Sequence, residues 1–290
     1  MIYKKTTYLP VDSDFEEYLK GSGCKYRLEF TNNTSVIFFD GSKYILSDEL
    51  LLPYELRFIQ SVKKYSEKLN IELPDFIASR IEYFSTGNIR NGVYYDVCEV
   101  DINSAYWEAA AKNNFISNDI YLKGVNKFPG QKDKISKKCR LIALGSLATV
   151  KTIVDFDGSD YKYVSTKKNN KTRKYFFKCA LDISKVMKDA INESGGSVLF
   201  HWCDAIFIHA NYVDSVMSFF NERGYSVKVK KLNCIHVKGS KMTVSEIVKS
   251  ENQDLFTNFR MKTFNIRSEY KRLKKQKDDF LNNLKHIDNA

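Results

Sequence analysis

The sequence has little of what builds cross-linked, secreted or membrane-spanning proteins. Among its 290 residues are only 4 prolines, and its 6 cysteines are scattered, with no Cys-x-x-Cys pair. This spacing argues against a zinc site and against the disulfide framework of a secreted domain. No apolar run approaches the ~20 residues that a membrane-spanning helix needs, so we expect no membrane partner.

Targeting and metal-binding histidine signals are also missing. The first residues, Met1–Lys5, lead into no apolar segment of the kind that a signal peptide contains, and we therefore expect a cytoplasmic protein. No pair of the 4 histidines lies near a cysteine or carboxylate at ligand spacing, so we interpret them as structural residues.

What the chain does have is apolar residues and positive charge. It is 43% hydrophobic and 14% aromatic, which suffices for a buried core. The formal net charge is +11, and the segment 123–178 alone holds 15 lysines and arginines against 4 acidic residues. The rest of the chain is therefore nearly neutral, and this concentration of charge favours a polyanionic partner.

The order of strand-like and helix-like segments predicts an α+β fold in three parts. Residues 1–90 are expected to form a small mixed α/β unit with strands near 24–30, 36–39 and 43–46 and a helix over 56–69. Residues 91–244 are expected to form an antiparallel sheet with helices on one face, interrupted by a basic insertion over 117–177. Residues 245–290 are predicted to form a helical tail.

Two details of the middle part concern charge. Residues 150–177 are predicted to form a long hairpin whose basic tip spans 167–174, a candidate phosphate-tracking finger. Residues 225–232 alternate with lysines, as is typical of an edge strand.

Two aspartates mark candidate chemistry. Asp101 ends the apolar strand 97–102 and precedes a helix, and Asp204 lies between the apolar segments 198–203 and 205–208. We expect the two carboxylates to meet in space. Mg²⁺ prefers oxygen ligands and needs only one or two protein carboxylates, and two such ions about 4 Å apart support phosphoryl transfer.

The segment Asp101-Ile102-Asn103-Ser104-Ala105-Tyr106 resembles motif A of family B DNA polymerases, Asp-x-x-Ser-Leu-Tyr, with Ala105 in place of leucine. The segment 202–207, Trp-Cys-Asp-Ala-Ile-Phe, resembles a shortened motif C that keeps the first aspartate and lacks the second. Residues 140–148 weakly resemble motif B. The resemblance covers about residues 93–240 and implies a polymerase palm, with a fingers-like insertion and a thumb-like or docking tail.

The resemblance also implies roles for individual residues. Asp101 and Asp204 would be catalytic and hold Mg²⁺ (or Mn²⁺), together with the backbone carbonyl of Ile102. Backbone amides near Asn103 and Ser104 would face a nucleoside triphosphate, and Tyr106 would pack under its sugar. Lys138 or Arg140 would neutralise the phosphates. The candidate nucleic-acid contacts are Lys167, Lys168, Lys171, Arg173, Lys174, Lys238 and Lys241.

Three functions remain open on these residues. The first is a minimal family B-like nucleotidyltransferase without an exonuclease domain, acting on nucleic acid, with DNA favoured over RNA, and with a possible replication protein as partner. The second is a catalytically degenerate palm that serves as a nucleic-acid-binding or replisome adaptor. The third is an RNase H-like nuclease, which would need further acidic ligands such as Asp96 or Glu99.

Overall fold

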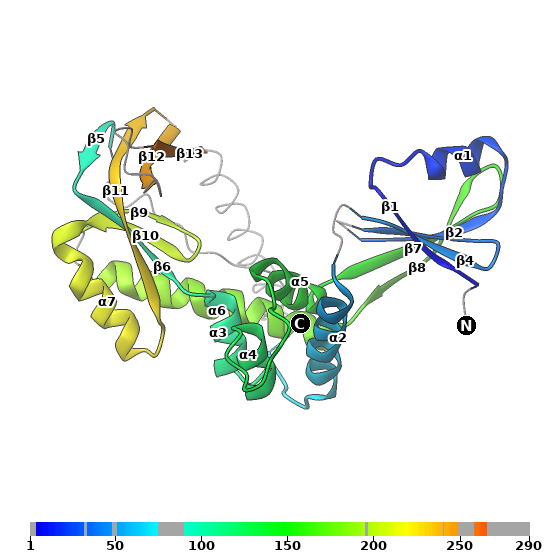
Figure 1. Cartoon of the computed structure of the whole chain (residues 1–290), viewed down its shortest axis with the longest axis horizontal. Helices are drawn as coiled ribbons and strands as arrows, with labels where there is room; N and C mark the ends of the chain where they lie inside the picture. Colours follow the sequence, from blue (N-terminus) through cyan, green and yellow to red (C-terminus); the bar gives the residue numbers. More distant parts are fainter. Residues whose placement is uncertain are drawn as a thin grey trace, which may run out of the picture. The chain divides into compact units, whose positions relative to one another are not determined.

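The computed structural model describes residues 4–31, 34–47, 51–74, 90–194, 197–239, 241–248 and 258–265. It confirms the α+β class, because the chain contains helices together with two sheets whose strands pair almost entirely antiparallel (Figure 1). The chain divides into two compact units, residues 1–72 with 116–176 and residues 73–115 with 177–290. No helix within the described ranges is both long and apolar enough to cross a membrane.

The first unit contains a six-stranded sheet in the order β1-β4-β3-β2-β7-β8. Only β1 and β4 pair in parallel; the other neighbours are antiparallel. Its apolar core includes Leu19 of helix α1 (Phe15–Gly21) and Leu28, Ile37 and Phe156 of the sheet. The strands are β1 (Thr6–Leu9), β2 (Tyr26–Phe30), β3 (Ser35–Phe39), β4 (Ser42–Leu46), β7 (Val150–Phe156) and β8 (Tyr161–Lys168).

Helices α2 (Pro53–Lys68), α4 (Asn118–Gly124) and α5 (Lys137–Leu147) complete this unit together with the start of α6 (Asn170–Glu193). Pro53 occupies the first turn of α2, where a missing N–H costs no hydrogen bond. Ser136 caps α5 by accepting from the Cys139 N–H, and its hydroxyl donates to Glu55 of α2 at 2.7 Å. This side-chain link joins the start of α2 to the start of α5.

The second unit contains a seven-stranded sheet in the order β13-β12-β11-β6-β10-β9, with β5 also paired to β11. Every recorded pairing in it is antiparallel. Helix α3 (Ala105–Lys112) follows β6, and α7 (Val213–Glu222) contacts β6 and β11. The strands are β5 (Gly92–Tyr95), β6 (Val97–Ile102), β9 (Val198–Trp202), β10 (Ala205–His209), β11 (Val227–Lys238), β12 (Lys241–Val248) and β13 (Asn258–Asn265).

The division of the chain differs from the predicted one. The predicted insertion 117–177 is grouped, except for Phe177, with residues 1–72 instead of interrupting the second unit, because β2 pairs with β7 over five residue pairs. The predicted helical tail is wrong for 245–248 and 258–265, which belong to the antiparallel pair β12 and β13. In β12, Met242 and Val244 are buried whereas Lys241 and Thr243 are not, which matches the two-residue period of a strand. The other tail residues lie outside the described ranges.

The predicted basic hairpin tip also needs correction. The hairpin β7–β8 turns at residues 157–160, where the Asp157 carboxylate accepts from the N–H groups of Ser159 and Asp160, so its tip is acidic and not basic. The residues 170–174 instead begin α6. Strand β11 pairs with β6 over residues 227–231 and with β12 over residues 232–238.

Candidate active site

Strand β6 carries the first candidate residue, Asp101, between β10 and β11 in the middle of the sheet. Val97, Val100 and Ile102 of this strand are buried, whereas Glu99 and Asp101 are partly exposed. Residues two apart on a strand share a face, so both carboxylates lie on one face of the sheet. The strand therefore fixes Asp101 rigidly while leaving its side chain accessible.

Asp204 lies in the two-residue turn that joins β9 to β10. The preceding residue, Cys203, has a φ of +53°, a left-handed conformation that glycine usually supplies at this position of a tight hairpin. The ring Nε2 of buried His201 lies 2.8 Å from the Cys203 carbonyl oxygen. A non-glycine residue held in this conformation stores strain of about 1 to 2 kcal/mol, a feature that clusters at functional sites.

The pairing of β6 with β10 brings the two aspartates to neighbouring strand ends. Ala205 is the direct partner of Asp101, and the Ile102 N–H donates to the Asp204 carbonyl at 3.0 Å. In a strand the N–H and C=O of one residue point to the same edge, so the Ile102 carbonyl also points toward the turn that carries Asp204. Asp101, Ile102 and Asp204, the predicted metal ligands, are therefore adjacent.

Of the two residues that follow β6, Asn103 contacts the residue before β11 and Ser104 precedes helix α3. The Asn103 N–H donates to the Ser226 carbonyl at 2.9 Å, and its side-chain amide lies 3.3 Å from the Ser226 hydroxyl. Ser104 has a left-handed conformation, φ 51° and ψ 41°, at the start of α3, and its carbonyl accepts from the Trp107 and Glu108 N–H groups. The Asn103 backbone N–H is thus engaged within the fold, which speaks against the part of the prediction that has it face a phosphate.

Helix α3 presents its two aromatic residues differently. Trp107 is 2% exposed and belongs to the core, whereas Tyr106 is only partly buried. The far end of the helix is fixed by Lys112, whose Nζ donates to the Arg223 carbonyl at 2.5 Å and lies 3.2 Å from the Tyr225 ring centroid. Burial lowers the pKa of Lys112 and raises the pKa of Tyr225 to about 12. Tyr106 thus sits on a well-anchored helix beside the candidate site.

Two lysines that the sequence placed on an edge strand lie next to the candidate carboxylates. Lys228 of β11 is the direct partner of Asp101, and Lys230 is the direct partner of Glu99. Directly opposite residues of antiparallel strands share a face, with Cβ atoms about 5 Å apart. The alternating lysines of this strand are visible in the sequence, but only the strand register shows that they lie opposite Asp101 and Glu99.

The candidate phosphate-neutralising residues lie in the first unit. Lys138 is exposed in the first turn of α5. Arg140 is partly buried, and its Nη1 donates to the carbonyl of Gly124 at the end of α4 at 2.8 Å. Burial lowers the pKa of Arg140. Arg140 therefore links two helices, and Lys138 is the more accessible cation.

The candidate nucleic-acid contacts fall into two groups. Lys167 and Lys168 are exposed at the end of β8, and Lys171 donates to the Leu69 carbonyl at 2.7 Å. Arg173 and Lys174 are partly buried in the first turns of α6. In the second unit Lys238 and Lys241 are exposed and directly paired at the β11–β12 turn.

Within the described ranges, no group of three or more histidine, cysteine, aspartate or glutamate side chains is arranged to hold a metal ion. The candidate set consists of two carboxylates and one backbone carbonyl. Such a set suits Mg²⁺, which keeps several waters and shares substrate phosphates, better than it suits Zn²⁺. Neither a protein-family model nor a curated protein sequence matches this chain.

Proposed function

We propose that the protein is a nucleotidyltransferase that resembles a minimal family B DNA polymerase and acts on nucleic acid in the cytoplasm. The observation that supports this most directly is the hydrogen bond from the Ile102 N–H to the Asp204 carbonyl. It makes neighbours of two aspartates that are far apart in the sequence, one at a strand end before a helix and one in a hairpin turn. Phosphoryl transfer needs little more from a protein than such positioned charge.

The residues at this position fit a divalent cation of the Mg²⁺ or Mn²⁺ type. The donor set is entirely oxygen, from Asp101, Asp204 and the Ile102 carbonyl, and the carboxylates are partly exposed. When bound, two such ions would activate a hydroxyl and stabilise a leaving pyrophosphate. Lys228, directly opposite Asp101, adds positive charge on the same face.

The test is nucleotide incorporation by single variants. With a labelled primer, nucleoside triphosphates and Mg²⁺ or Mn²⁺, Asp101→Asn and Asp204→Asn should each lower incorporation by about 10³-fold, because each removes a carboxylate that would hold the cations that balance the reacting phosphates. Asp214→Asn is the matched control, since Asp214 is exposed in the first turn of α7. Unchanged melting temperatures would show that the variants are folded. Full activity in either active-site variant would refute the proposal.

A binding adaptor is the second candidate, and one observation favours it. The position after Asp204 is Ala205, which is 6% exposed and directly faces Asp101, so this end of the hairpin supplies one carboxylate only. Mn²⁺ titration followed by electron paramagnetic resonance separates the two functions. An adaptor would bind oligonucleotide, incorporate nothing and show no Mn²⁺ binding that depends on Asp101 and Asp204.

The same assay detects a nuclease, because a nuclease shortens the labelled strand instead of extending it. It would also depend on Glu99, which shares a face with Asp101 but is paired with Lys230. Glu99→Gln should leave incorporation intact under the proposed function and abolish cleavage under the nuclease interpretation.

A further inference from the structure

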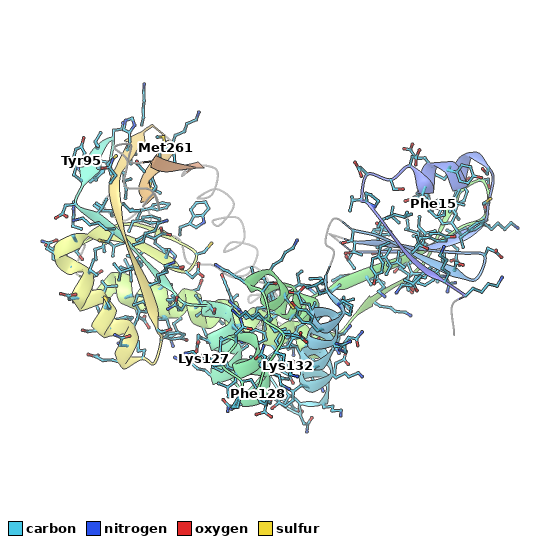
Figure 2. All side chains as sticks on the ribbon, in the orientation of Figure 1. Phe15, Tyr95, Lys127, Phe128, Lys132 and Met261 are labelled. Carbon is cyan, nitrogen blue, oxygen red and sulfur yellow. The ribbon has the colours of Figure 1, made fainter. Side chains whose placement is uncertain are left out.

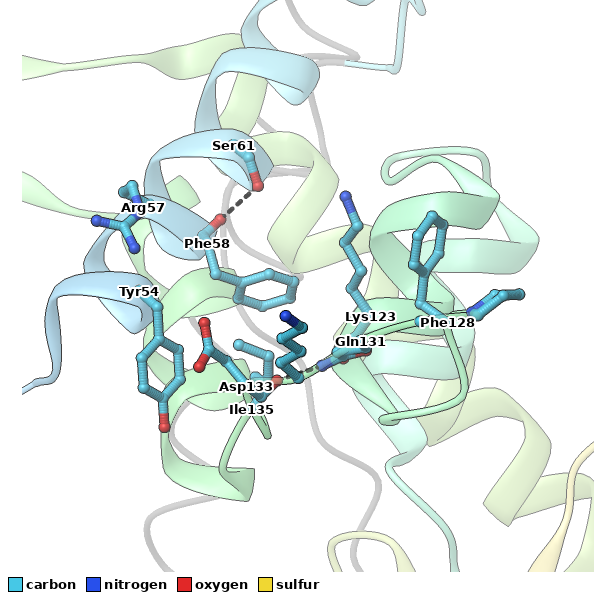
Figure 3. A pocket seen from close by; sticks show the side chains of 12 residues that line it. Tyr54, Arg57, Phe58, Ser61, Lys123, Phe128, Gln131, Asp133 and Ile135 are labelled. Carbon is cyan, nitrogen blue, oxygen red and sulfur yellow. Dashed lines mark hydrogen bonds between the residues drawn. The ribbon is translucent and has the colours of Figure 1, made fainter.

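A pocket of about 400 Å³ lies within the first unit, between helix α2 and the loop from α4 to α5 (Figure 3). Its size is in the range of small-ligand sites, roughly 300 to 1,000 Å³. The pocket belongs to the first unit, whereas the candidate aspartates belong to the second. The pocket is lined by Tyr54, Arg57, Phe58, Ser61, Lys123, Phe128, Pro129, Gly130, Gln131, Lys132, Asp133 and Ile135.

The loop that forms one wall is held in place by its own side chains. The Asn126 side chain accepts from the Ile135 N–H at 2.7 Å and donates to the Ile135 carbonyl at 3.0 Å. The Gln131 Nε2 donates to the Lys123 and Asp133 carbonyls and to the Asn126 Oδ1, at 3.1, 2.7 and 3.1 Å. These bonds span the whole loop, so the wall is preformed and a ligand would not have to order it.

Three aromatic rings contribute apolar surface to the pocket. Phe58 is buried on α2, and Tyr54, one turn before it, donates its hydroxyl to the Lys134 carbonyl at 3.2 Å. Phe128 comes from the opposite wall and is partly exposed. Figure 2 shows Phe128 on the loop beside Lys127 and Lys132. Such rings offer flat surfaces on which a nucleobase can stack.

The rim of the pocket is positively charged. Arg57, Lys123 and Lys132 are all exposed there, and Asp133 is the one acidic residue among the pocket-lining residues. The Lys123 ammonium lies 4.6 Å from the Phe128 ring centroid, so charge and aromatic surface are adjacent. An anionic ligand with an aromatic part matches this combination better than a purely apolar one.

One polar atom of the pocket-lining residues, the side-chain oxygen of Gln131, is buried. The three acceptors around Gln131 Nε2 fix the orientation of the amide, which makes the other atom, Oε1, an acceptor. This oxygen is buried, and within the described part of the chain it has no hydrogen-bond partner. A buried acceptor without a donor is costly, but this oxygen is closed to solvent, so a ligand in the pocket would not reach it without a movement of the loop.

We propose that this pocket binds a nucleotide, either free or as one unit of a single strand, with its base between the aromatic walls and its phosphate at the cationic rim. A free nucleotide and a nucleotide within a strand present the same two groups to the pocket, an aromatic base and a phosphate. This site would anchor a nucleotide on the unit that does not carry the candidate aspartates. It does not depend on the proposed function, since a protein without polymerase activity could use it equally well.

The test measures binding to the intact chain. Calorimetric titrations use deoxyadenosine monophosphate, deoxyadenosine, inorganic phosphate and a single-stranded octamer of deoxyadenylate. The pocket variants are Arg57→Gln combined with Lys132→Gln, and separately Phe128→Ala. Their matched control is Lys63→Gln combined with Lys134→Gln, which removes the same charge from exposed lysines of α2 and the loop that do not line the pocket.

We expect each pocket variant to weaken binding of the monophosphate or the octamer about 10-fold, and the control to weaken it less than 2-fold, because stacking and phosphate contacts act locally. Binding of both ligands supports a site for free and strand-borne nucleotides, and binding of the octamer alone assigns it to a strand. Equal losses in pocket and control variants, equally tight binding of phosphate alone, or no binding of either nucleotide ligand would overturn the proposal. Active-site variants of Asp101 or Asp204 should bind the monophosphate normally.

Discussion

Individual residues of this protein hold conformations that their side chains do not favour. Cys203 in the β9–β10 turn and Ser104 at the start of α3 both have φ near +50°. The first precedes Asp204 directly, and the second follows Asp101 by three positions. The strain at both positions is thus local to the candidate active site.

The strain at Cys203 leads to a prediction about stability. Cys203→Gly should raise the free energy of unfolding by about 0.5 to 1 kcal/mol, because glycine adopts positive φ without steric cost. Cys234→Gly is the control, since it makes the same change within strand β11 and should be destabilising there. Urea unfolding measures the free energy of unfolding of both variants and of the wild type. A loss of stability in Cys203→Gly as large as the loss in Cys234→Gly would contradict strain at the turn.

Cysteine reactivity provides a second prediction at the scale of single residues. Burial raises the pKa of Cys139 to about 12 and also raises the pKa values of Cys98 and Cys179. Because the thiolate is the reactive form, these three thiols should resist an alkylating reagent at pH 8 in the folded protein. The other cysteines, Cys24, Cys203 and Cys234, are partly exposed and should react first. Mass spectrometry of the alkylated protein distinguishes them, and rapid labelling of Cys139 would contradict its burial.

At the scale of elements, the first unit depends on a polar link between helices α2 and α5. Glu55 is 6% exposed, and it accepts from the Ser136 hydroxyl at 2.7 Å and from the Leu52 N–H at 3.2 Å. The Ser136 hydrogen bond is the main reason that the pKa of Glu55 lies below its ordinary value of 4.5. The carboxylate therefore stabilises the folded state in its charged form.

Glu55→Gln should lower the free energy of unfolding by about 1 to 2 kcal/mol at pH 7. The folded-state pKa lies below the unfolded one, so this contribution is present above pH 4.5 and is lost as the pH falls through the lower folded value. The difference between wild type and variant should consequently shrink on acidification. Urea unfolding between pH 3 and pH 7 measures it, with exposed Glu67→Gln as control. A constant difference across this range would exclude the ionised Glu55 as its cause.

At the scale of the whole molecule, positive charge is concentrated in the first unit and the candidate aspartates lie in the second. The net charge of +11 equals that of segment 123–178 alone, most of which belongs to the first unit. Under the proposed function, the first unit would bind an anionic strand and the second unit would position metal ions.

Removing charge from the end of β8 should weaken binding to single-stranded nucleic acid. For Lys167→Gln with Lys168→Gln, we expect the slope of log K against log salt to fall by about 0.7 for each lost phosphate contact. Fluorescence anisotropy of a labelled oligonucleotide at several salt concentrations gives this slope. Lys63→Gln with Lys64→Gln on α2 removes equal charge, and the same change in slope from this pair would show that the charge acts without a defined position.

The sequence by itself determined the fold class and most of the helices and strands, because apolar periodicity and turn residues are local properties. It also singled out the two candidate aspartates. It predicted β2, β3, β4, α2, β6, β9 and β10 near their observed positions. The tertiary structure decided which distant strands pair: β2 with β7, β6 with β10, and β12 with β13. Because of those pairings, Lys228 lies opposite Asp101 and residues 116–176 belong to the first unit. Part of the predicted helical tail forms strands for the same reason. Hydrogen-bond register between strands far apart in the chain leaves no local pattern, and therefore only the folded structure reveals it.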